Sequence, residues 1–377
     1  MKEYLMIPGP TQVPPEVISA MARPMINHRG PEFADIFKEC TEGCQWAYQT
    51  KKDLFILTAS GTGGMEAAIA NTLSPGDKVI VGNIGAFGAR FVKICKVYGI
   101  TVEEIKVERG KALEPSAVKE KLDADKNIKA VFFQQNETST GVLNDVKAIS
   151  QAIAGRALVI VDAISGLLTA DLKTDEWGLD VVIAGSQKAF MIPPGLSFIS
   201  FSEKAWKAYE SAKCPKFYFD LALARKFLEK WTTPATPPIS VVYGLQKALQ
   251  MLKEEGLDNI FKRHDKMAKG VRAAIRALGA KPLSEDKVGS RSVTGVVFPE
   301  GVDAEAIRKT VKKGYGVTMA GGQEDLKGKI FRIGHMGYVG YGDLVTTFFA
   351  LENVLNDLGH KVVPGSSVAA FEQAYKG

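Results

Sequence analysis

The sequence predicts an α/β protein with a large, mainly parallel β-sheet and a smaller C-terminal α/β domain. Short apolar runs of strand length alternate with helical patterns, and turn residues separate them, at 54–58, 78–83, 130–134, 157–162, 181–184 and 197–201. Runs that are apolar throughout are typical of strands that are buried on both faces by helices. Beyond about residue 260 the order changes to helix, strand, helix, strand, helix. We therefore expect three parts: an N-terminal segment 1–15, a large domain 16–260 and a small domain 261–377, whose tail from residue 361 is a peripheral extension.

Composition indicates a globular protein and gives no sign of a nucleic-acid or membrane partner. The chain has 377 residues, of which 46% are hydrophobic, and this is enough for a large core and a second domain. The net charge of +6 is spread over helical patterns in which basic and acidic residues alternate, so we expect no nucleic-acid partner. No signal peptide is evident and no stretch approaches the roughly 20 apolar residues of a membrane span. We expect a cytoplasmic protein with no membrane contact.

The four cysteines predict no metal site. Cys40 and Cys44 are spaced to share one side of a helix, where two metal ligands could sit, but no Cys-x-x-Cys pair occurs. Buried thiols in a reducing compartment are the simpler interpretation. The four histidines do not cluster with the cysteines along the sequence, and we therefore expect no bound metal.

A lysine at a strand end is the strongest chemical signal. The apolar run 181–184 leads into Gly185-Ser186-Gln187-Lys188. A lysine in this position can form a Schiff base when it is desolvated beside an anionic cofactor. Ser186 and Gln187 could donate to a phosphate or ring oxygen. Taken alone, the motif could equally belong to an ordinary loop.

A second strand ends in a carboxylate. Asp162 closes the run 157–162, where a buried charge is costly unless it has a cationic partner. A protonated cofactor ring nitrogen is such a partner, and it makes the ring an electron sink. A helix cap or a structural ion pair is the alternative.

The segment after the first strand predicts an anion site. Ser60, Gly61 and Thr62 follow this strand and open a helix, whose free amides bind phosphate. A dinucleotide loop would need an acidic residue at the end of the next strand, which instead ends in Asn83, so the phosphate interpretation is favoured.

Two further strand ends contribute candidates for ring contacts. Phe87 could stack on a flat cofactor, although a core phenylalanine would look the same. Glu137 and Thr138 follow the run 130–134 and could reach a ring hydroxyl or the substrate; the same string could be a polar turn.

Taken together, these motifs resemble a known family. Their order and the motifs IPGPTQVPPEV, SGTGGMEAA, NETSTGV, IVDAISG, GSQKAFMIPPG, TPATPPISVVYGL and FRIGHMG resemble the class V branch of the fold-type I aminotransferases, in particular the alanine–glyoxylate, serine–glyoxylate and serine–pyruvate enzymes. The resemblance covers nearly the whole chain. It implies a large domain with a seven-stranded-type sheet and pyridoxal 5'-phosphate as the cofactor.

The resemblance assigns a role to each candidate. Lys188 resembles the lysine that carries the cofactor and acts as base, and Asp162 the partner of the ring nitrogen. The residues that match other cofactor contacts are Ser60, Gly61, Thr62, Phe87, Thr138, Gln187 and Thr236, the last of which reaches the neighbouring subunit's phosphate in the family. Arg332 matches the arginine that binds the substrate carboxylate, and Gly9 lies in the N-terminal loop at the pocket mouth.

The chain departs from the family at two places. Thr233 stands where the alanine–glyoxylate enzymes have a tyrosine, and Gly166, beside Ser165, stands where some relatives have a serine. These changes affect the partner-subunit contact and one side of the substrate site.

The resulting expectation is a homodimeric transaminase with shared active sites, which moves an amino group from serine or alanine to glyoxylate or pyruvate. A phosphoserine aminotransferase is the alternative; it would need a second anion site, for which Arg29 and Arg90 are candidates. A cysteine desulfurase is disfavoured because no cysteine follows Cys214. A non-enzymatic subunit of a redox complex is disfavoured by the combination of Lys188, Asp162 and Arg332.

Overall fold

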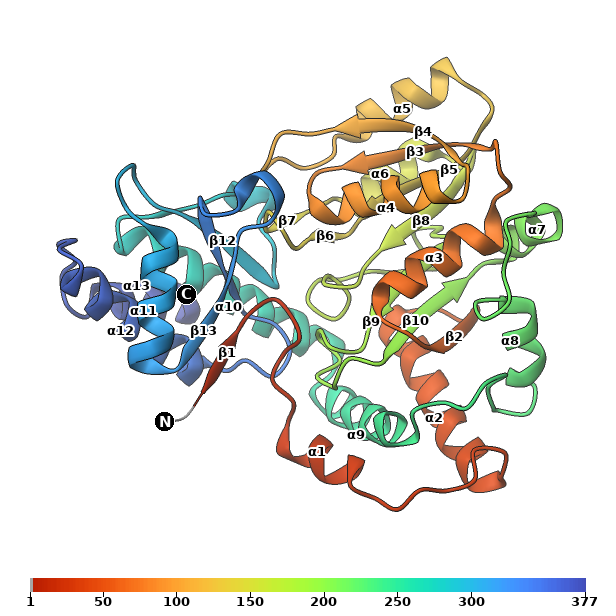
Figure 1. Cartoon of the computed structure of the whole chain (residues 1–377), viewed down its shortest axis with the longest axis horizontal. Coiled ribbons are helices and arrows are strands. Elements are labelled where there is room, and N and C mark those ends of the chain that lie inside the picture. Colours follow the sequence, from red (N-terminus) through yellow and green to blue (C-terminus); the bar gives the residue numbers. More distant parts are fainter. Residues whose placement is uncertain (1–2) are drawn as a thin grey trace.

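The computed structural model describes residues 3–377 (Figure 1). Its large sheet has seven strands in the order β2 (Asp53–Thr58), β10 (Leu196–Phe201), β9 (Val181–Gly185), β8 (Leu158–Asp162), β5 (Ile128–Gln134), β3 (Lys78–Asn83) and β4 (Thr101–Lys106). All neighbours are parallel except β10, which runs antiparallel to β2 and β9. The predicted mainly parallel sheet is thereby confirmed, and the carboxyl ends of its parallel strands meet at one edge.

Helices cover both faces of this sheet. One hydrophobic core lies between the sheet and α2 (Pro31–Tyr48), α5 (Pro115–Ala124), α6 (Val146–Ile153) and α9 (Ile239–Glu255). The other core includes α3 (Gly61–Thr72), α4 (Ala86–Val97), α7 (Glu203–Ser211) and the start of α8 (Leu221–Leu228). Neighbouring residues on a strand enter opposite cores, as Leu54 and Phe55 do on β2. This two-sided burial is why the strands are apolar throughout.

The small domain contains a five-stranded sheet to which the N-terminal segment contributes. Its order is β1 (Tyr4–Met6), β13 (Val317–Gly321), β14 (Ile330–Gly334), β12 (Val293–Val297) and β11 (Lys281–Pro282). Strand β1 runs parallel to β13, and the chain then passes through α1 (Pro15–Met21), which packs on α9. Residues 4–6 therefore belong structurally to the small domain although they begin the chain.

Four helices complete the small domain: α10 (Leu257–Ala277), α11 (Ala304–Tyr315), α12 (Tyr341–Asp357) and α13 (Ser366–Lys376). Two 3-10 turns, Asp286–Val288 and Glu324–Leu326, lie in its loops. The expected boundary between residues 260 and 261 falls inside α10. A two-stranded hairpin, β6 (Asn136–Glu137) with β7 (Val142–Leu143), lies between the two sheets and meets residue Gly289 of the small domain.

The tail is part of the small-domain core, contrary to the expectation of a peripheral extension. Helix α13 packs against α10 and α12, and Phe371 is fully buried. The buried carboxylate of Glu352 on α12 accepts from the Gly365 and Ser367 amides at 2.8 and 2.6 Å, and thereby caps α13. The packing of α13 on α10 and α12 depends on contacts between helices, which the local sequence pattern of the tail does not indicate.

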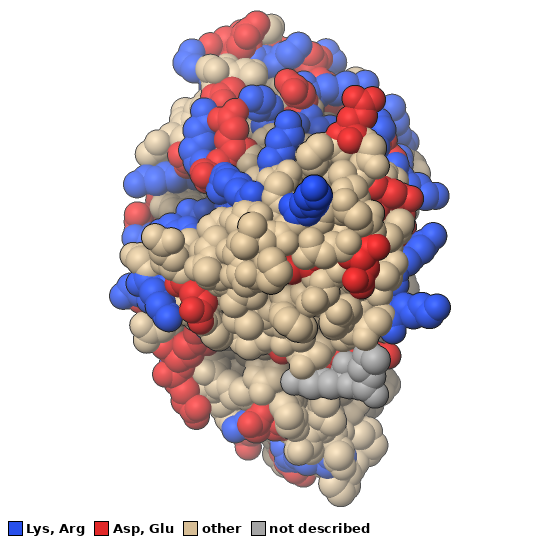
Figure 2. Space-filling model, turned by 90° about the vertical axis from the view of Figure 1, so that its left-hand side faces the viewer, with Lys and Arg blue, Asp and Glu red and all other residues tan. Residues whose placement is uncertain are grey.

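The outer face of the small domain carries charges of both signs. Figure 2 shows basic and acidic residues interspersed around this face, and uncharged residues over its centre. No helix within residues 3–377 combines the length and the apolar character that a membrane crossing needs.

Candidate active site

Lys188 is buried between the end of β9 and the N-terminal segment, close to the buried Asp162 and Arg332, and we call this group of three side chains the chamber. The Lys188 side chain is 8% exposed, and Nζ donates to the backbone oxygen of Pro8 at 2.5 Å. A Cβ atom on Gly9 would come within 2.6 Å of Nζ, and the φ of +123° at Gly9 also favours glycine. The N-terminal segment thus forms a wall against the lysine, and the predicted position of Gly9 at the pocket is consistent with this contact.

Asp162 lies at the end of β8, near enough to Lys188 for each of the two charges to shift the pKa of the other group. Burial raises the pKa of Asp162 to about 7; the charge of Glu137 adds to the rise, while Lys188 and Arg90 oppose it. Burial lowers the pKa of Lys188 to about 8, and Arg332 and Arg90 lower it further against the opposing effect of Asp162. An amine and a carboxyl group that both titrate near neutrality therefore share one chamber.

The start of α3 supplies uncapped amides beside these two strand ends. Ser60 is its N-cap residue, and no side chain caps the helix. Gly61 packs so closely against Ile164, two residues after Asp162, that a Cβ atom at residue 61 would lie 2.5 Å from its Cδ1. The buried Oε1 of Gln187 has no hydrogen-bond partner within residues 3–377. A helix N-terminus with free amides is suited to an anion such as a phosphate, whereas the unpartnered Gln187 oxygen can only accept a hydrogen bond, for example from a hydroxyl.

The first two turns of α4 bring Phe87 and Arg90 to the same region. The Arg90 guanidinium carbon lies 4.7 Å from the centroid of the Phe87 ring, and Nη1 donates to Thr62 Oγ1 at 2.9 Å. Arg90 therefore joins the candidate ring-stacking residue to the candidate phosphate loop. The sequence had identified Arg90 only as a group for a second substrate anion.

The small domain contributes Arg332 from β14. Its guanidinium is buried and donates to the Thr138 oxygen at 3.1 Å, to Gln323 Oε1 at 3.2 Å and, from Nε and Nη2, to the Gly321 oxygen at 3.0 and 2.8 Å. Burial lowers the pKa of Arg332 to about 10, which leaves the group charged at neutral pH. The contact with Thr138 joins the two domains at the chamber.

Thr138 itself is held by the neighbouring loop. Its Oγ1 lies 2.6 Å from Ser165 Oγ, which also bonds to the Asn136 backbone oxygen. The departure at Gly166 has a steric reason, because a Cβ atom there would overlap the side chain of Gln135.

Glu137, Ser186 and Arg29, which the sequence suggested as contacts for cofactor or substrate, bond to other parts of the protein instead. Glu137 does not project toward a ring hydroxyl or substrate; both its oxygens accept hydrogen bonds from residues 87, 88 and 139. The Ser186 hydroxyl donates to the Pro193 oxygen at 2.8 Å and accepts from the Leu196 amide, so it holds its own loop. Arg29 donates to the Thr233 and Pro234 oxygens at 2.6 and 3.0 Å, which fixes the loop that carries Thr236.

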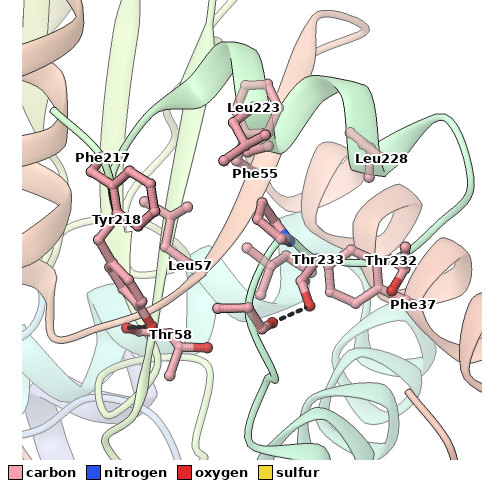
Figure 3. Close-up of a pocket in the computed structure, with 14 residues that line it drawn as sticks. Phe37, Phe55, Leu57, Thr58, Phe217, Tyr218, Leu223, Leu228, Thr232 and Thr233 are labelled. Carbon is pink, nitrogen blue, oxygen red and sulfur yellow. Dashed lines mark hydrogen bonds between the residues drawn. The ribbon is translucent and has the colours of Figure 1, made fainter. Parts of the chain in front are cut away.

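Thr236 is exposed on this loop, beside a separate apolar pocket. The pocket has a volume of about 150 Å³ and lies between the free edge of β2, helix α8 and residues 232–235 (Figure 3). Tyr218 donates to the Thr58 oxygen at 3.4 Å, and Phe217 is 86% exposed. Thr58 lines this pocket and precedes Ser60 by two residues, so the pocket adjoins the candidate phosphate loop, whereas Lys188 is not part of its lining.

Comparison with known proteins decides the family. Residues 3–333 match the model of the class-V aminotransferases. The chain belongs to this family. It is 48% identical to a protein named the small subunit of a soluble hydrogenase from a Synechococcus strain, over 98% of this chain and 97% of that one.

Two relatives that are named as enzymes match this chain over nearly their whole length. The L-aspartate–glyoxylate aminotransferase of Paracoccus denitrificans is 37% identical, with 99% of this chain and 96% of that one covered. The serine–glyoxylate aminotransferase of Methylorubrum extorquens is 38% identical, with 98% and 95% covered. Among solved structures, the ureidoglycine–glyoxylate aminotransferase of Bacillus subtilis superposes with a TM-score of 0.94 at 29% identity, and the match covers 100% of this chain and 99% of that chain. These matches confirm the predicted fold-type I architecture.

Class-V aminotransferases depend on pyridoxal phosphate, and the residues present fit this cofactor. The uncapped amides at the start of α3 suit the phosphate and the buried Lys188 amine suits the aldehyde, while the unpartnered Gln187 oxygen can accept a hydrogen bond from a hydroxyl. Within residues 3–377 no three His, Cys, Asp or Glu side chains are arranged to hold a metal ion, and the four cysteines are free and buried.

Proposed function

We propose that this aminotransferase moves an amino group from a small amino acid, serine or alanine, to glyoxylate or pyruvate. The observation that carries the proposal is the burial of Lys188 beside Asp162 and Arg332, whose opposite charges act on the Lys188 amine. The names of the relatives support glyoxylate as acceptor, since the serine and aspartate enzymes both use it according to their names.

Each residue would make a different contact with the cofactor, according to its position. The amides of Ser60, Gly61 and Thr62, with Gln187, would hold the phosphate of pyridoxal phosphate. Phe87 would stack on the ring, Asp162 would face its nitrogen and Thr138 would lie near its hydroxyl. When bound, the cofactor supplies the electron sink that makes the substrate Cα–H bond acidic.

Lys188 is the proton carrier in this proposal. Its pKa of about 8 lets the amine give and take a proton near neutral pH, which is the condition for efficient acid–base catalysis. The wall of Pro8 and Gly9 keeps Nζ inside the chamber and away from bulk water.

Arg332 would bind the α-carboxylate that amino donors and oxo-acid acceptors have in common. Its planar guanidinium can form two charge-assisted hydrogen bonds with a carboxylate. A second carboxylate or phosphate would need another cation. Arg29 is engaged by two backbone oxygens and Arg90 by Thr62 Oγ1 and the Phe87 ring, so both candidates for that role already have partners. This favours serine or alanine over phosphoserine, the alternative substrate.

We also propose a homodimer whose active sites are shared. Thr236 and Ser60 are both exposed. Phe217 and Tyr218 are also exposed and line the pocket (Figure 3), which includes Ala235 and Thr58, close in sequence to Thr236 and Ser60. A second copy placed over this surface would bring Thr236 to the other subunit's phosphate loop. Dilution experiments test this, because a monomer that keeps full activity would contradict it.

A donor and acceptor panel tests the reaction. Purified protein with pyridoxal phosphate is assayed with serine, alanine, aspartate, glutamate and phosphoserine against glyoxylate, pyruvate and phosphohydroxypyruvate. We expect serine or alanine with glyoxylate or pyruvate to be the best pairs. If glutamate with phosphohydroxypyruvate were best, the phosphoserine alternative would replace the proposal.

The cofactor assignment is tested separately. Borohydride reduction followed by peptide mapping should place the adduct on Lys188, and Lys188→Ala should give no adduct. A protein with no visible absorbance after incubation with pyridoxal phosphate would favour the non-enzymatic interpretation, which the hydrogenase-subunit name of a relative makes worth excluding.

A further inference from the structure

Helix α4 has no N-terminal cap of its own. Its N-cap residue is Gly85, and no side chain in its own first turn accepts from the free amides there. Instead, residues of the β6–β7 hairpin accept hydrogen bonds from these amides. Phe87 N and Gly88 N donate to Glu137 Oε2 at 3.0 and 3.2 Å. Ser139 Oγ accepts from Ala86 N at 2.9 Å. The cap is therefore supplied by residues about 50 positions further along the chain.

Glu137 is fully buried and fully hydrogen-bonded. Its second oxygen, Oε1, accepts from Ser139 N at 3.0 Å and from Ser139 Oγ at 2.6 Å. Burial raises the pKa of Glu137, and the four hydrogen bonds oppose this rise and, with the helix dipole, favour the carboxylate. A Cβ atom on Gly85 would overlap Glu137 and Ser139, so this helix start fits the carboxylate only if residue 85 is glycine.

The capped turn carries two side chains of the candidate site. Phe87 lies in it, and Arg90 follows one turn later, where it stacks on Phe87 and donates to Thr62. Between the two capping residues, the Thr138 oxygen accepts from Arg332. Residues 137–139 therefore contact the helix that carries the aromatic ring and the arginine that comes from the small domain.

We propose that Glu137 is a positioning residue for the transaminase reaction. By capping α4 it sets where Phe87 and Arg90 stand relative to the start of α3, and through Thr138 it sets where Arg332 stands. Glu137 itself touches neither substrate nor cofactor, since all four of its hydrogen bonds go to protein donors. The functional part of this inference rests on the proposed function, whereas the capping itself does not.

Glu352 provides a matched control within the same chain. It is also a buried glutamate, and it caps α13 through the Gly365 amide, the Ser367 amide and the Ser367 hydroxyl. Helix α13 lies in the small domain, packed on α10 and α12. Glu137→Ala and Glu352→Ala therefore remove the same type of cap, one beside the chamber and one remote from it.

The first measurement is hydrogen–deuterium exchange of cofactor-free protein in the peptide that covers residues 85–90. Glu137→Ala should accelerate exchange there by about tenfold or more, the effect of losing hydrogen bonds to a charged acceptor. Glu352→Ala should accelerate exchange in residues 365–369 only. Unchanged exchange at 85–90 in Glu137→Ala would refute the capping role.

The second measurement is the dissociation constant of pyridoxal phosphate, read from visible absorbance. Glu137→Ala should weaken binding by about tenfold, while Glu352→Ala should bind as the wild type does. Glu137→Gln, which keeps the shape but loses the charge, should be intermediate and serves if the alanine variant does not fold. Equal affinity in Glu137→Ala, Glu137→Gln and wild type would overturn the positioning role. Failure of the wild type to bind the cofactor would instead refute the proposed function, and the exchange result would still decide whether Glu137 is a cap.

Discussion

The lowered pKa of Lys188 can be used to test whether burial and the neighbouring charges set the reactivity of this amine. The pKa falls from 10.5, the ordinary value for lysine, to about 8, mainly because burial disfavours the ammonium form. The difference corresponds to about 3 kcal/mol. At pH 7 about a tenth of the side chains would be neutral amines, compared with about one in three thousand for an ordinary lysine. The neutral amine is the nucleophile, so its reaction with an aldehyde should become faster as the pH rises through about 8.

The assay follows visible absorbance after pyridoxal phosphate is added to cofactor-free protein at a series of pH values. Two variants should move the midpoint in opposite directions. Asp162→Asn removes an anion that raises the pKa of Lys188, so the midpoint should fall. Arg332→Gln removes a cation that lowers it, so the midpoint should rise.

Asp123→Asn, a change in an exposed ion pair with Lys119 and Arg156, is the control and should leave the midpoint unchanged. A wild-type midpoint near 10, or a shift of both chamber variants in one direction, would show that burial and neighbouring charge do not set the reactivity of Lys188.

Four further outcomes follow from the described contacts. Asp162→Ala should keep the fold but lower turnover by about two orders of magnitude or more, because the ring nitrogen loses its counter-charge; near-normal kcat would make Asp162 structural. Gly9→Ala places a Cβ atom 2.6 Å from Lys188 Nζ and should prevent borohydride-trapped adduct formation. Phe371→Ala should lower the free energy of unfolding by about 3–5 kcal/mol, measured by denaturant titration, if the tail belongs to the core. Arg332→Ala should raise KM for donor and acceptor alike by about tenfold or more, with partial recovery in Arg332→Lys, whereas an effect on one substrate alone would argue against a shared carboxylate site.

Most of the large sheet could be predicted because its strands are buried on both faces. The runs at 54–58, 78–83 and 181–184 coincide with β2, β3 and β9 to within one residue. Strand β4 was not predicted, because it is an edge strand whose residues TVEEIK are half exposed and partly charged. Strand β1 was not predicted either, since three residues give no periodicity and its partner β13 lies more than 300 positions away.

The candidate site was predictable where a side chain directly follows a strand. Lys188 and Asp162 were found this way, because the ends of parallel strands necessarily meet at one edge of the sheet. The roles of Glu137 and Arg90 could not be found, because both depend on contacts between segments that are distant in the sequence. Glu137 bonds to amides 50 positions earlier, and no local pattern distinguishes a remote helix cap from a residue that faces a substrate.

Arg332 shows how the chamber can be rigid before a substrate arrives. In the free chain its donors are occupied by three neutral oxygens, those of Thr138, Gly321 and Gln323. The guanidinium is therefore fixed in place, and binding need not order a long flexible side chain. Hydrogen bonds to a carboxylate are about twice as strong as those to neutral oxygens, so a substrate can displace the weaker contacts. Gln323 accepts through a side-chain amide, which can rotate away, whereas the other two partners are backbone carbonyls. The exchange should consequently begin at Gln323, while Thr138 and Gly321 keep the arginine aligned.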